Sequence, residues 1–417
     1  MSDLRIDGAR LQRSLEELAE VGAYRDERTG LVGVNRLALT AADGAGRRLV
    51  KRWFEEAGLA VRVDRIGNCY GRRKGLSDAA PVLSGSHIDS VPTGGAFDGA
   101  LGVLGALEVV RTLNDSRVRT ERPIEVAFFT EEEGCRFGTD MLGSAVAVGR
   151  VPLDRALALV DKSGLTVGDE LAAIGFAGDA DPLLAAPHAY VEVHIEQGPI
   201  LAAAGMDLGV VTGVQGISWW ELTVVGKSAH AGTTPMELRH DPGLAASLVN
   251  VRLDEMARQG RYGKEMRATM GRIDPHPGLV NIVPSRVVCT VDLRNPDDLR
   301  MADAERDLFA YVKEIEARLG VAIEARQTAR TQRIPFSTEV QAVIARHMER
   351  AGHRFQPILS GAGHDAQEIA SLCPTAMIFV RGEYDGISHN PREFSTPEAC
   401  TRGVQILLDS LIELAGR

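Results

Sequence analysis

Residues 81–104 read PVLSGSHIDSVPTGGAFDGALGVL, and this stretch decides the fold. The apolar run that begins at Pro81 predicts a buried strand, and His87 follows it directly. A glycine-rich turn then leads to Asp98, and a helix is expected to begin near Leu101. This order of strand, turn and helix places an imidazole and a carboxylate at the carboxyl end of a parallel strand, where both could hold a metal ion.

Two aspartates in this stretch suit different roles at such a site. Asp89, two residues after His87, could orient the imidazole through a hydrogen bond. The carboxylate of Asp98 has two oxygens, so it could bridge two metal ions. The alternative interpretation is a capped turn around a buried, hydrogen-bonded histidine, and this stretch alone does not distinguish the two.

The composition is that of a globular protein with room for two domains. The chain has 417 residues and a formal net charge of −10, with no basic tract, so nucleic acid is not an expected partner. No long uncharged apolar segment predicts a membrane span, and no apolar secretory signal follows Met1. Five scattered cysteines without a Cys-x-x-Cys motif favour a reducing compartment, so we expect a cytoplasmic protein.

The order of the predicted elements indicates an α/β fold. Apolar strands at residues 81–84, 123–130 and 189–195 alternate with helices, which predicts a mostly parallel sheet flanked by helices. Residues 24–39 are rich in Arg, Thr, Gly and Asn and are expected to form a loop. The alternation of strands and helices resumes near residue 335, so we expect a discontinuous catalytic domain.

Between the two parts of the catalytic domain, the sequence pattern predicts an inserted α+β domain. Residues 217–225 alternate as an antiparallel strand does, and two long helices are expected at residues 241–258 and 298–319. Further strands are predicted around residues 267–273, 285–293 and 321–327, which gives a four-stranded antiparallel sheet. The predicted domains are a catalytic di-metal domain of residues 1–210 and 330–417, and a lid or dimerisation domain of residues 211–329.

Acids and histidines follow several of the predicted strands. Glu131, Glu132 and Glu133 come directly after a buried strand, where three carboxylates are costly unless a cation compensates them. His194 lies in a later strand, and His389 lies in a loop after another. Taken singly, the acids could be a solvated loop and His389 a turn residue. Together with His87 and Asp98, these side chains form a suitable ligand set for two divalent ions.

Nine motifs, in order along most of the chain, resemble those of the di-metal peptidase-like amidohydrolases. The details are similar to the branch of N-carbamoyl-L-amino-acid hydrolases, allantoate amidohydrolases and β-ureidopropionases. His194 favours this branch, because the peptidase branch usually has a carboxylate there. The motifs are GSHIDS (85–90), FDGALG (97–102), EEEG (131–134), HIEQGP (194–199), GKSAHAGTTP (226–235), NIVP (281–284), DLRN (292–295), SGAGHD (360–365) and GISHNP (386–391).

The resemblance implies two metal sites with a shared ligand. His87, Asp98 and His194 would hold one divalent ion. Asp98, Glu133 and His389 would hold the other, with Asp98 as the bridge. Zinc is the first expectation for both ions, and manganese, cobalt and nickel are the alternatives. Glu132, beside the ligand Glu133, would be the general base and later the general acid.

The resemblance also implies the groups that contact the substrate. His230 would stabilise the developing oxyanion from the inserted domain, reaching into the site of the partner subunit. Asn281 and Arg294 would hold the substrate carboxylate, and Asp292 lies on the same strand face as Arg294. The ureido end would meet Gln197, Gly361, Gly363 and His364. Read from the residues alone, His230 could instead be a turn residue and Arg294 an exposed cation.

The implied reaction is hydrolysis of the carbamoyl C–N bond of an N-carbamoyl-L-amino acid to the amino acid, carbon dioxide and ammonia. Allantoate amidohydrolase and β-ureidopropionase are alternatives, followed by an aminoacylase or dipeptidase and by a metal-binding scaffold without catalysis. Retention of Glu132 argues against the scaffold, because metal binding does not need the base. The partner is a small ureido substrate. A homodimer through the inserted domain is expected, because adjacent Trp219 and Trp220 on an alternating strand face opposite sides.

Overall fold

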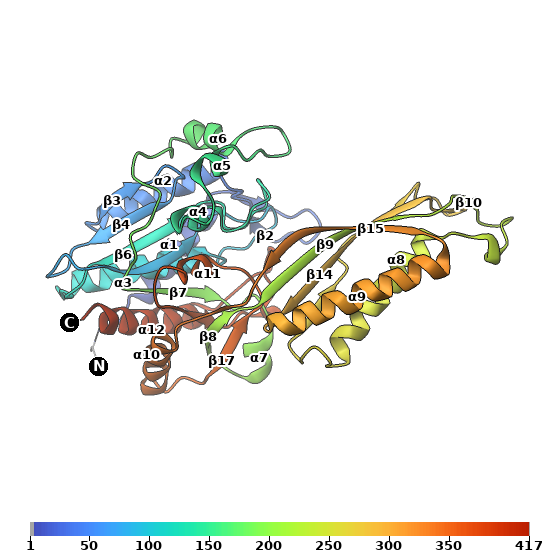
Figure 1. Ribbon diagram of the computed structural model, residues 1–417. Coiled ribbons are helices and arrows are strands. Elements are labelled where there is room, and N and C mark those ends of the chain that lie inside the picture. Colours follow the sequence, from blue (N-terminus) through green and yellow to red (C-terminus); the bar gives the residue numbers. More distant parts are fainter. Residues whose placement is uncertain (1–3, 417) are drawn as a thin grey trace. The chain divides into compact units, whose positions relative to one another are not determined.

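The computed structural model describes residues 4–416, and the chain divides into two compact units (Figure 1). The first unit comprises Met1–Gly213 and Pro335–Arg417. The second, inserted unit is Val214–Ile334, close to the predicted bounds of 211 and 329. In the described part of the chain, no helix combines the length and the apolar character that a membrane span requires.

The first unit is built on a mixed sheet. Among the described residues this sheet has nine strands, in the order β16-β8-β18-β7-β5-β6-β4-β3, with β17 paired to β8. The strands are β3 (Ala60–Val63), β4 (Cys69–Arg73), β5 (Val82–His87), β6 (Ile124–Phe129), β7 (Ala189–Ile195), β8 (Leu208–Val214), β16 (Ile334–Pro335), β17 (Phe355–Ser360) and β18 (Thr375–Val380).

The central strands are parallel and their neighbours are not. β18, β7, β5 and β6 pair in parallel, whereas β8 pairs with β18, and β4 with β6, in the antiparallel sense. β3 and β4 are joined by a short turn, which permits only antiparallel pairing. The predicted α/β class with flanking helices is confirmed, and the parallel part of the sheet is its centre.

Helices cover both faces of this sheet. α1, α3 and α12 pack together on one face, and α11 packs with α4 on the other (Figure 1). The helices of this unit are α1 (Gly8–Glu20), α2 (Ala41–Glu56), α3 (Ala100–Asp115), α4 (Leu142–Ala147), α5 (Leu153–Leu157), α6 (Val167–Ile174), α7 (Ile200–Ala204), α10 (Thr338–Arg350), α11 (Asp365–Ile369), η2 (Tyr384–Gly386) and α12 (Pro397–Ala415). The expected loop at residues 24–39 contains a short hairpin of β1 (Ala23–Arg25) and β2 (Val32–Val34).

α3 packs unusually close to the strands that it follows. Nearly every residue of α3 is buried, because the helix lies between the sheet and two other helices. Gly102 permits the close approach, since a Cβ there would lie 2.6 Å from the Cβ of Ser86 on β5. Gly105 does the same toward Val404 of α12, at 2.8 Å. The amino end of α3, which follows Asp98, is therefore pressed against the end of β5.

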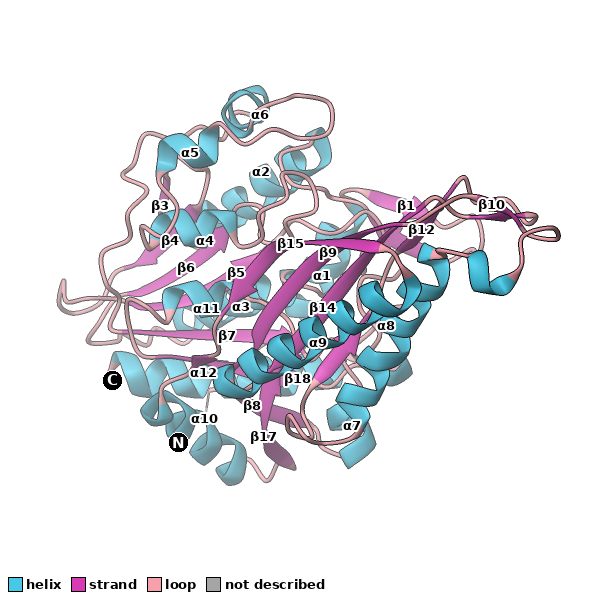
Figure 2. Cartoon of the chain, turned by 45° about the vertical axis from the view of Figure 1, so that its right-hand side comes forward, coloured by secondary structure: helices cyan, strands magenta, loops and turns pink. Residues whose placement is uncertain are grey.

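The inserted unit has one antiparallel sheet with helices on one face (Figure 2). The described residues of this sheet form five strands where four were predicted, which corrects the sequence analysis. The strand expected at residues 267–273 is two strands, interrupted around Gly271, and both pair with β14. The sheet consists of β11 (Arg267–Thr269), β12 (Ile273–His276), β14 (Arg286–Asn295), β9 (Gly216–Val225) and β15 (Ala322–Thr331).

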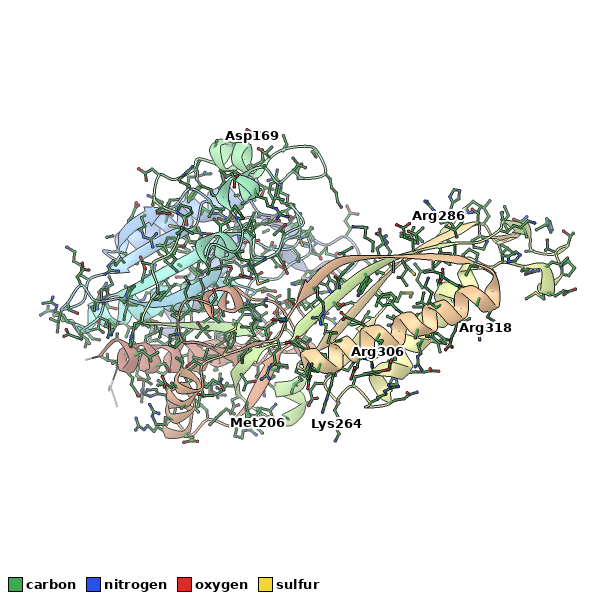
Figure 3. All side chains as sticks on the ribbon, in the orientation of Figure 1. Asp169, Met206, Lys264, Arg286, Arg306 and Arg318 are labelled. Atoms are coloured by element: carbon green, nitrogen blue, oxygen red, sulfur yellow. The ribbon has the colours of Figure 1, made fainter. Side chains whose placement is uncertain are left out.

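α8 (Pro242–Arg258) and α9 (Asp298–Leu319) bury the apolar side of this sheet. Trp220 packs against Phe309 of α9, with ring centroids 4.5 Å apart, whereas Trp219 lies on the opposite face and is 38% exposed. The predicted alternation of the two rings is confirmed. Arg306 and Arg318 project from the exposed side of α9 (Figure 3).

A separate two-stranded ribbon belongs to the same unit. β10 (Ala229–His230) pairs antiparallel with β13 (Ile282–Val283), and the short helix η1 (Met236–Leu238) follows β10. This ribbon brings together two of the motifs from the sequence analysis, 226–235 and 281–284, although about fifty residues separate them.

Candidate metal centre

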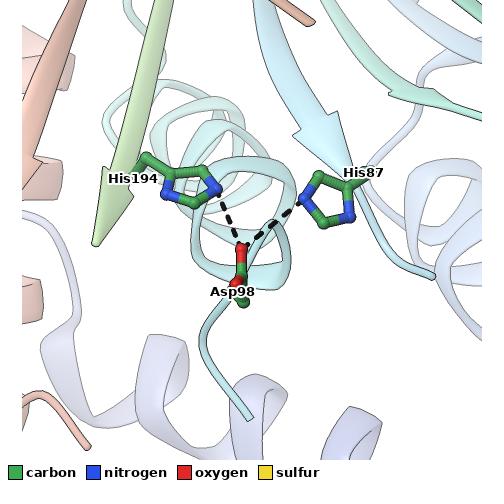
Figure 4. A group of neighbouring side chains, drawn as sticks. All are labelled: His87, Asp98 and His194. Atoms are coloured by element: carbon green, nitrogen blue, oxygen red, sulfur yellow. Dashed lines mark ion pairs between the residues drawn. The ribbon is translucent and has the colours of Figure 1, made fainter. Parts of the chain in front are cut away.

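Two parallel strands deliver a histidine each to the same edge of the first unit's sheet. His87 is the last residue of β5, His194 lies near the end of β7, and Asp98 stands between their rings (Figure 4). Oδ1 of Asp98 lies 3.2 Å from Nε2 of His194 and 3.7 Å from Nε2 of His87. All three side chains are buried, so this group is a compact set of ligand atoms that could hold a metal ion.

The other oxygen of Asp98 faces a second set of ligand atoms. Oδ2 of Asp98 lies 3.4 Å from Nε2 of His389, and that nitrogen lies 3.3 Å from Oε2 of Glu133. Asp98, Glu133 and His389 form a second group that could hold a metal ion. Since the two groups use different oxygens of one carboxylate, the geometry suits a bridging ligand between two cations.

Backbone carbonyls orient both buried imidazoles. Nδ1 of His87 donates to the carbonyl oxygen of Asp89 at 3.0 Å, and Nδ1 of His194 donates to that of Ile195 at 2.9 Å. The amide of Gly99 donates to Nε2 of His194, which marks Nε2 as the unprotonated atom. With the Nδ1 proton held by the backbone, each ring turns Nε2 toward Asp98, as a metal ligand requires.

The carboxylate of Asp89 does not make the expected hydrogen bond to the imidazole of His87. This carboxylate lies 3.8 Å from Nδ1 of His87, too far for a hydrogen bond, and the carbonyl oxygen of Asp89 orients the ring instead. The carboxylate accepts the amides of Glu132 and Glu133, at 3.4 and 3.3 Å. Asp89 therefore positions the turn that carries the two acids.

The three consecutive acids have different environments. Glu131 adopts a positive φ of 54° and accepts the amides of Arg136 and Phe137, so it stabilises the turn. Glu133 faces His389, as described above. Glu132 is buried, with Oε2 3.4 Å from Nε2 of His87. Burial raises the pKa of Glu132 well above its usual value, against the opposing effect of His87.

The carboxylates and the imidazoles of the site shift one another's pKa values. Burial alone would raise the pKa of Asp98, but the neighbouring histidines His194, His389 and His87 hold that pKa well below its usual value. Hydrogen bonds to Asp98 and Glu133 raise the pKa of His389 to about 10. Carboxylates and imidazoles therefore lie close enough at this site to shift one another's pKa. The ligand set fits two divalent cations, which would supply positive charge beside the carboxylates.

Two residues that the sequence analysis did not single out support the bridge. Oγ of Ser388 lies 2.8 Å from Oδ2 of Asp98 and 2.7 Å from Oε2 of Glu393. Buried Glu393 also accepts the amides of Phe97 and Asp98. The Ser388 hydroxyl has one proton and can donate to only one of these two carboxylates. If it donates to Asp98, a proton on Glu393 is needed for the hydrogen bond between Glu393 and Ser388. Burial raises the pKa of Glu393 to about 7. Ser388 lies within a recognised motif, but nothing in the sequence marked Glu393.

The residues expected at the ureido end lie around the same centre. Nε2 of Gln197 donates to Oδ2 of Asp98 at 2.8 Å, and Oε1 of Gln197 is buried without a hydrogen-bond partner. His364 is buried against His194, and its Nε2 lies 2.9 Å from Oγ of Ser360, while its Nδ1 has no partner. These two buried atoms lack the hydrogen-bond partners that buried polar atoms normally have. Gly361 and Gly363 form the turn that leads from β17 to α11.

Backbone strain accompanies these positions. Glu131, Gln197 and His389 are not glycines, yet they have φ values of 54°, 57° and 56°. Such conformations are uncommon for residues with a side chain and cluster at functional sites. At Gln197 and His389 the strained backbone holds the side chain toward Asp98, whereas at Glu131 it belongs to the turn that this residue stabilises.

Glu192, His194 and His364 form a further group of close ligand atoms. Glu192, however, already accepts hydrogen bonds from Ser86, Tyr190 and the amide of Ala366. A metal ion at this group would have to displace them. We therefore interpret Glu192 as a support for the strands that carry the histidines.

Within the inserted unit, the structure places the other three expected residues as follows. His230 pairs with Ile282 in the ribbon, and the carbonyl of Asn281 accepts the amide of Ala231 at 2.9 Å, so His230 and Asn281 lie together. Arg294 lies on the helix-free face of the sheet. Its guanidinium donates to both oxygens of Asp292, at 2.9–3.1 Å, and lies 5.9 Å from the ring centre of Trp219.

Comparisons with known proteins identify the family of this chain. The model of peptidase family M20/M25/M40 matches residues 83–413. An N-carbamoyl-L-amino-acid amidohydrolase from Rhizobium meliloti is 40% identical over 413 residues, which cover 99% of this chain and 97% of that protein. An allantoate amidohydrolase from Bacillus subtilis is 32% identical over 404 residues, 96% of each chain. The crystal structure of an amidase of the hydantoinase/carbamoylase family from Burkholderia multivorans matches with a TM-score of 0.92 and 44% identity over 99% of both chains.

The chain therefore belongs to peptidase family M20/M25/M40. Within it, the resemblance to the carbamoylase branch that the motifs indicated is confirmed. The prediction of a hydrolase that acts on carbon–nitrogen bonds is also confirmed.

The different environments of Glu132 and Glu133 predict different losses on substitution. Glu132→Gln keeps the size of the side chain and removes the base, so we expect turnover to fall by about 10²–10⁴. Its metal content, measured by elemental analysis, should change little. Glu133→Gln removes a ligand and should lower metal content. The reverse result, with metal lost only from Glu132→Gln, would exchange the two assignments.

Proposed function

We propose that the protein hydrolyses the carbamoyl C–N bond of N-carbamoyl-L-amino acids. The observation that carries the proposal is Asp98 shared by two ligand groups, with the carboxylate of Glu132 beside them and outside both. Such a site suits attack by water on a carbonyl carbon. The identity of 40% to a relative named for N-carbamoyl-L-amino acids supports this choice of substrate.

Each residue has a defined part in the proposed reaction. Two divalent cations at the site would polarise the ureido carbonyl and lower the pKa of water. Glu132 accepts a proton from the attacking water and later delivers it to the leaving nitrogen, which breaks the C–N bond. His230 donates a hydrogen bond to the developing oxyanion. The products are the amino acid and carbamic acid, which decomposes to carbon dioxide and ammonia.

The polar atoms around Asp98 suit the unsubstituted end of a urea. We propose that Oε1 of Gln197, which has no hydrogen-bond partner in the structure, accepts an N–H of the terminal amide, and that the 361–364 turn contacts the same end of the substrate. For the ions we propose zinc, because imidazole and carboxylate ligands in small sets suit it, although manganese, cobalt and nickel take the same ligands.

We also propose a cytosolic location. All five cysteines are free thiols, four of them buried, with Cys135 exposed. A reducing compartment preserves exposed thiols of this kind.

A substrate screen with metal removal tests the proposed function. We expect ammonia release to be fastest with N-carbamoyl-L-amino acids, abolished by chelation and restored by a divalent ion. 3-Ureidopropionate, allantoate and N-acetyl amino acids are the comparison substrates. A strong preference for allantoate would identify the activity that the Bacillus subtilis relative is named for. Full activity of protein shown by elemental analysis to be metal-free would contradict the proposed mechanism.

Arg294 is the proposed receptor of the substrate carboxylate. Its planar guanidinium is held by Asp292 and lies near the ring of Trp219, so it is preorganised. Arginine binds a carboxylate through two parallel hydrogen bonds, whereas lysine offers a mobile point charge. The α-carboxylate distinguishes an N-carbamoyl amino acid from neutral ureas. Asn281 is proposed to donate a further hydrogen bond.

Arg294→Lys should lower kcat/KM for N-carbamoyl amino acids by about one to two decades, because a charge-assisted hydrogen bond contributes about 1.5–3 kcal/mol. The matched control is the neutral amide of the same substrate. The wild type should hydrolyse this amide poorly, and the substitution should barely change that rate. If acid and amide slowed equally, Arg294 would support the fold instead of binding the carboxylate.

We propose that the active protein is a homodimer in which His230 completes the partner's site. The ribbon that carries His230 is flanked by strongly exposed apolar side chains, which an interface would cover. Val280 is fully exposed, and Met236 and Leu238 are 71% and 63% exposed. The inserted unit would then serve both dimerisation and catalysis.

Complementation between two inactive variants tests this arrangement. In a random mixture of His230→Ala and Glu132→Gln subunits, half of the dimers are mixed, and one of the two sites in each is intact if His230 acts across the interface. Activity should therefore return to about a quarter of wild type. If His230 acts within its own subunit, the mixture stays inactive. A fully active monomer in light scattering would exclude the dimer.

A further inference from the structure

The imidazole of His230 makes one internal hydrogen bond that determines its tautomer. The backbone amide of Gly232 donates to Nδ1 of His230 at 3.1 Å. An amide nitrogen is only a donor, so Nδ1 must be the acceptor and carries no proton. In the neutral ring the proton therefore resides on Nε2. His230 is exposed, which leaves Nε2 open to a ligand.

Arg239 holds the backbone that makes this hydrogen bond possible. Its Nη2 donates to the carbonyl of Ala231 at 2.6 Å, and its Nε donates to the carbonyl of Thr234 at 3.0 Å. The amide of Thr234 in turn donates to the carbonyl of His230. Among the described residues no carboxylate forms an ion pair with the half-buried Arg239 guanidinium, so its two bonds to the loop are its defined contacts.

The other side of the loop is held by the ribbon. His230 pairs with Ile282, and the amide of Ala231 donates to the carbonyl of Asn281. Residues 230–234 are therefore held from two directions, by β13 and by Arg239. A loop held in this way keeps the Gly232 amide aimed at Nδ1.

We propose that the Gly232 amide and Arg239 position His230 as the Nε2-protonated tautomer, so that the ring offers a donor to the oxyanion. The inference rests on the proposed function, in which His230 meets that oxyanion. With the opposite tautomer, Nε2 would turn a lone pair toward a developing negative charge and repel it. Arg239 is a positioning residue, because it acts through His230 and not on the substrate.

Nitrogen NMR of the full-length protein tests the tautomer without any mutation. The protein is labelled with ¹⁵N-histidine and loaded with its divalent ion, and His230→Asn identifies the His230 signals by their absence. At a pH where the ring is neutral, we expect Nδ1 to show the shift of an unprotonated nitrogen and Nε2 that of a protonated one. A protonated Nδ1, or an even mixture of tautomers, would overturn the inference.

Paired substitutions test the consequence for catalysis. Gly232→Pro removes the amide, and Gly232→Ala keeps it. A Cβ at Gly232 would lie 3.5 Å from Cε1 of His230, an ordinary contact, so the alanine should be tolerated. We expect Gly232→Pro to lower kcat by about 10- to 100-fold with little change in KM, because the lost donor acts on the transition state. Gly232→Ala should stay near wild type.

Arg239→Lys provides a second variant that does not alter the turn itself. A lysine cannot span two carbonyls, so kcat should fall while metal content and dimer formation are retained. The control is Arg258→Lys on α8, whose guanidinium bonds Asp254 of the same helix. This control should have wild-type kcat. Equal kcat for Arg239→Lys and wild type would count against the inference.

A double-mutant cycle separates positioning from general stability. In the His230→Ala background, Arg239→Lys should have no further effect on kcat, because the residue that it positions is gone. A further loss there would assign Arg239 a structural role and overturn the inference. His230→Ala alone tests the proposed function: an unchanged kcat would remove His230 from the mechanism, whatever the NMR shows about its tautomer.

Discussion

The carboxylate of Asp98 is the constraint on which the rest of the site depends. Its Oδ1 faces two buried histidines, and its Oδ2 faces His389, Gln197 and Ser388. Each oxygen of this one carboxylate meets a different group, and the backbone brings Asp98 very close to the end of β5. Gly99 makes this possible, since it has a φ of 64° and a Cβ there would lie 2.5 Å from the ring of His87.

The buried acids that support the strands around Asp98 show how the protein tolerates so many buried carboxylates. Glu192 joins β5, β7 and α11 through Ser86, Tyr190 and the amide of Ala366, so one carboxylate fixes the strands that end in His87 and His194. Such a supporting carboxylate needs hydrogen-bond donors from the protein, because an unpaired buried charge would destabilise the fold by several kcal/mol. Asp98 and Glu133 belong to the groups of ligand atoms, where a bound cation would compensate their charge.

Periodicity and strand order predicted the α/β class, the inserted unit and the edge at which the ligands gather. These features follow from local patterns, because an apolar run and a glycine turn determine their own structure. The site's finer roles depend on distant contacts. Nothing in the run of three glutamates shows that Glu131 turns away, and Glu393 reaches Asp98 across nearly three hundred residues. Asp89 was assigned to His87 by spacing, but its carboxylate has two amides within reach. Strand β12 was missed because an interruption of three residues is invisible to an alternation pattern.

The candidate metal ligands lie in one unit, and the groups proposed to meet the oxyanion and the substrate carboxylate lie in the other. The ligand atoms and Glu132 belong to the first unit, and their hydrogen bonds close within it. The groups proposed to meet the oxyanion and the carboxylate, His230, Asn281 and Arg294, all belong to the inserted unit. Changes in that unit can therefore alter which substrate is bound while the reacting centre stays intact. An amidohydrolase named for N-carbamoyl-L-amino acids and one named for allantoate both resemble this chain over nearly its whole length, so a different substrate name within the family does not imply a different fold.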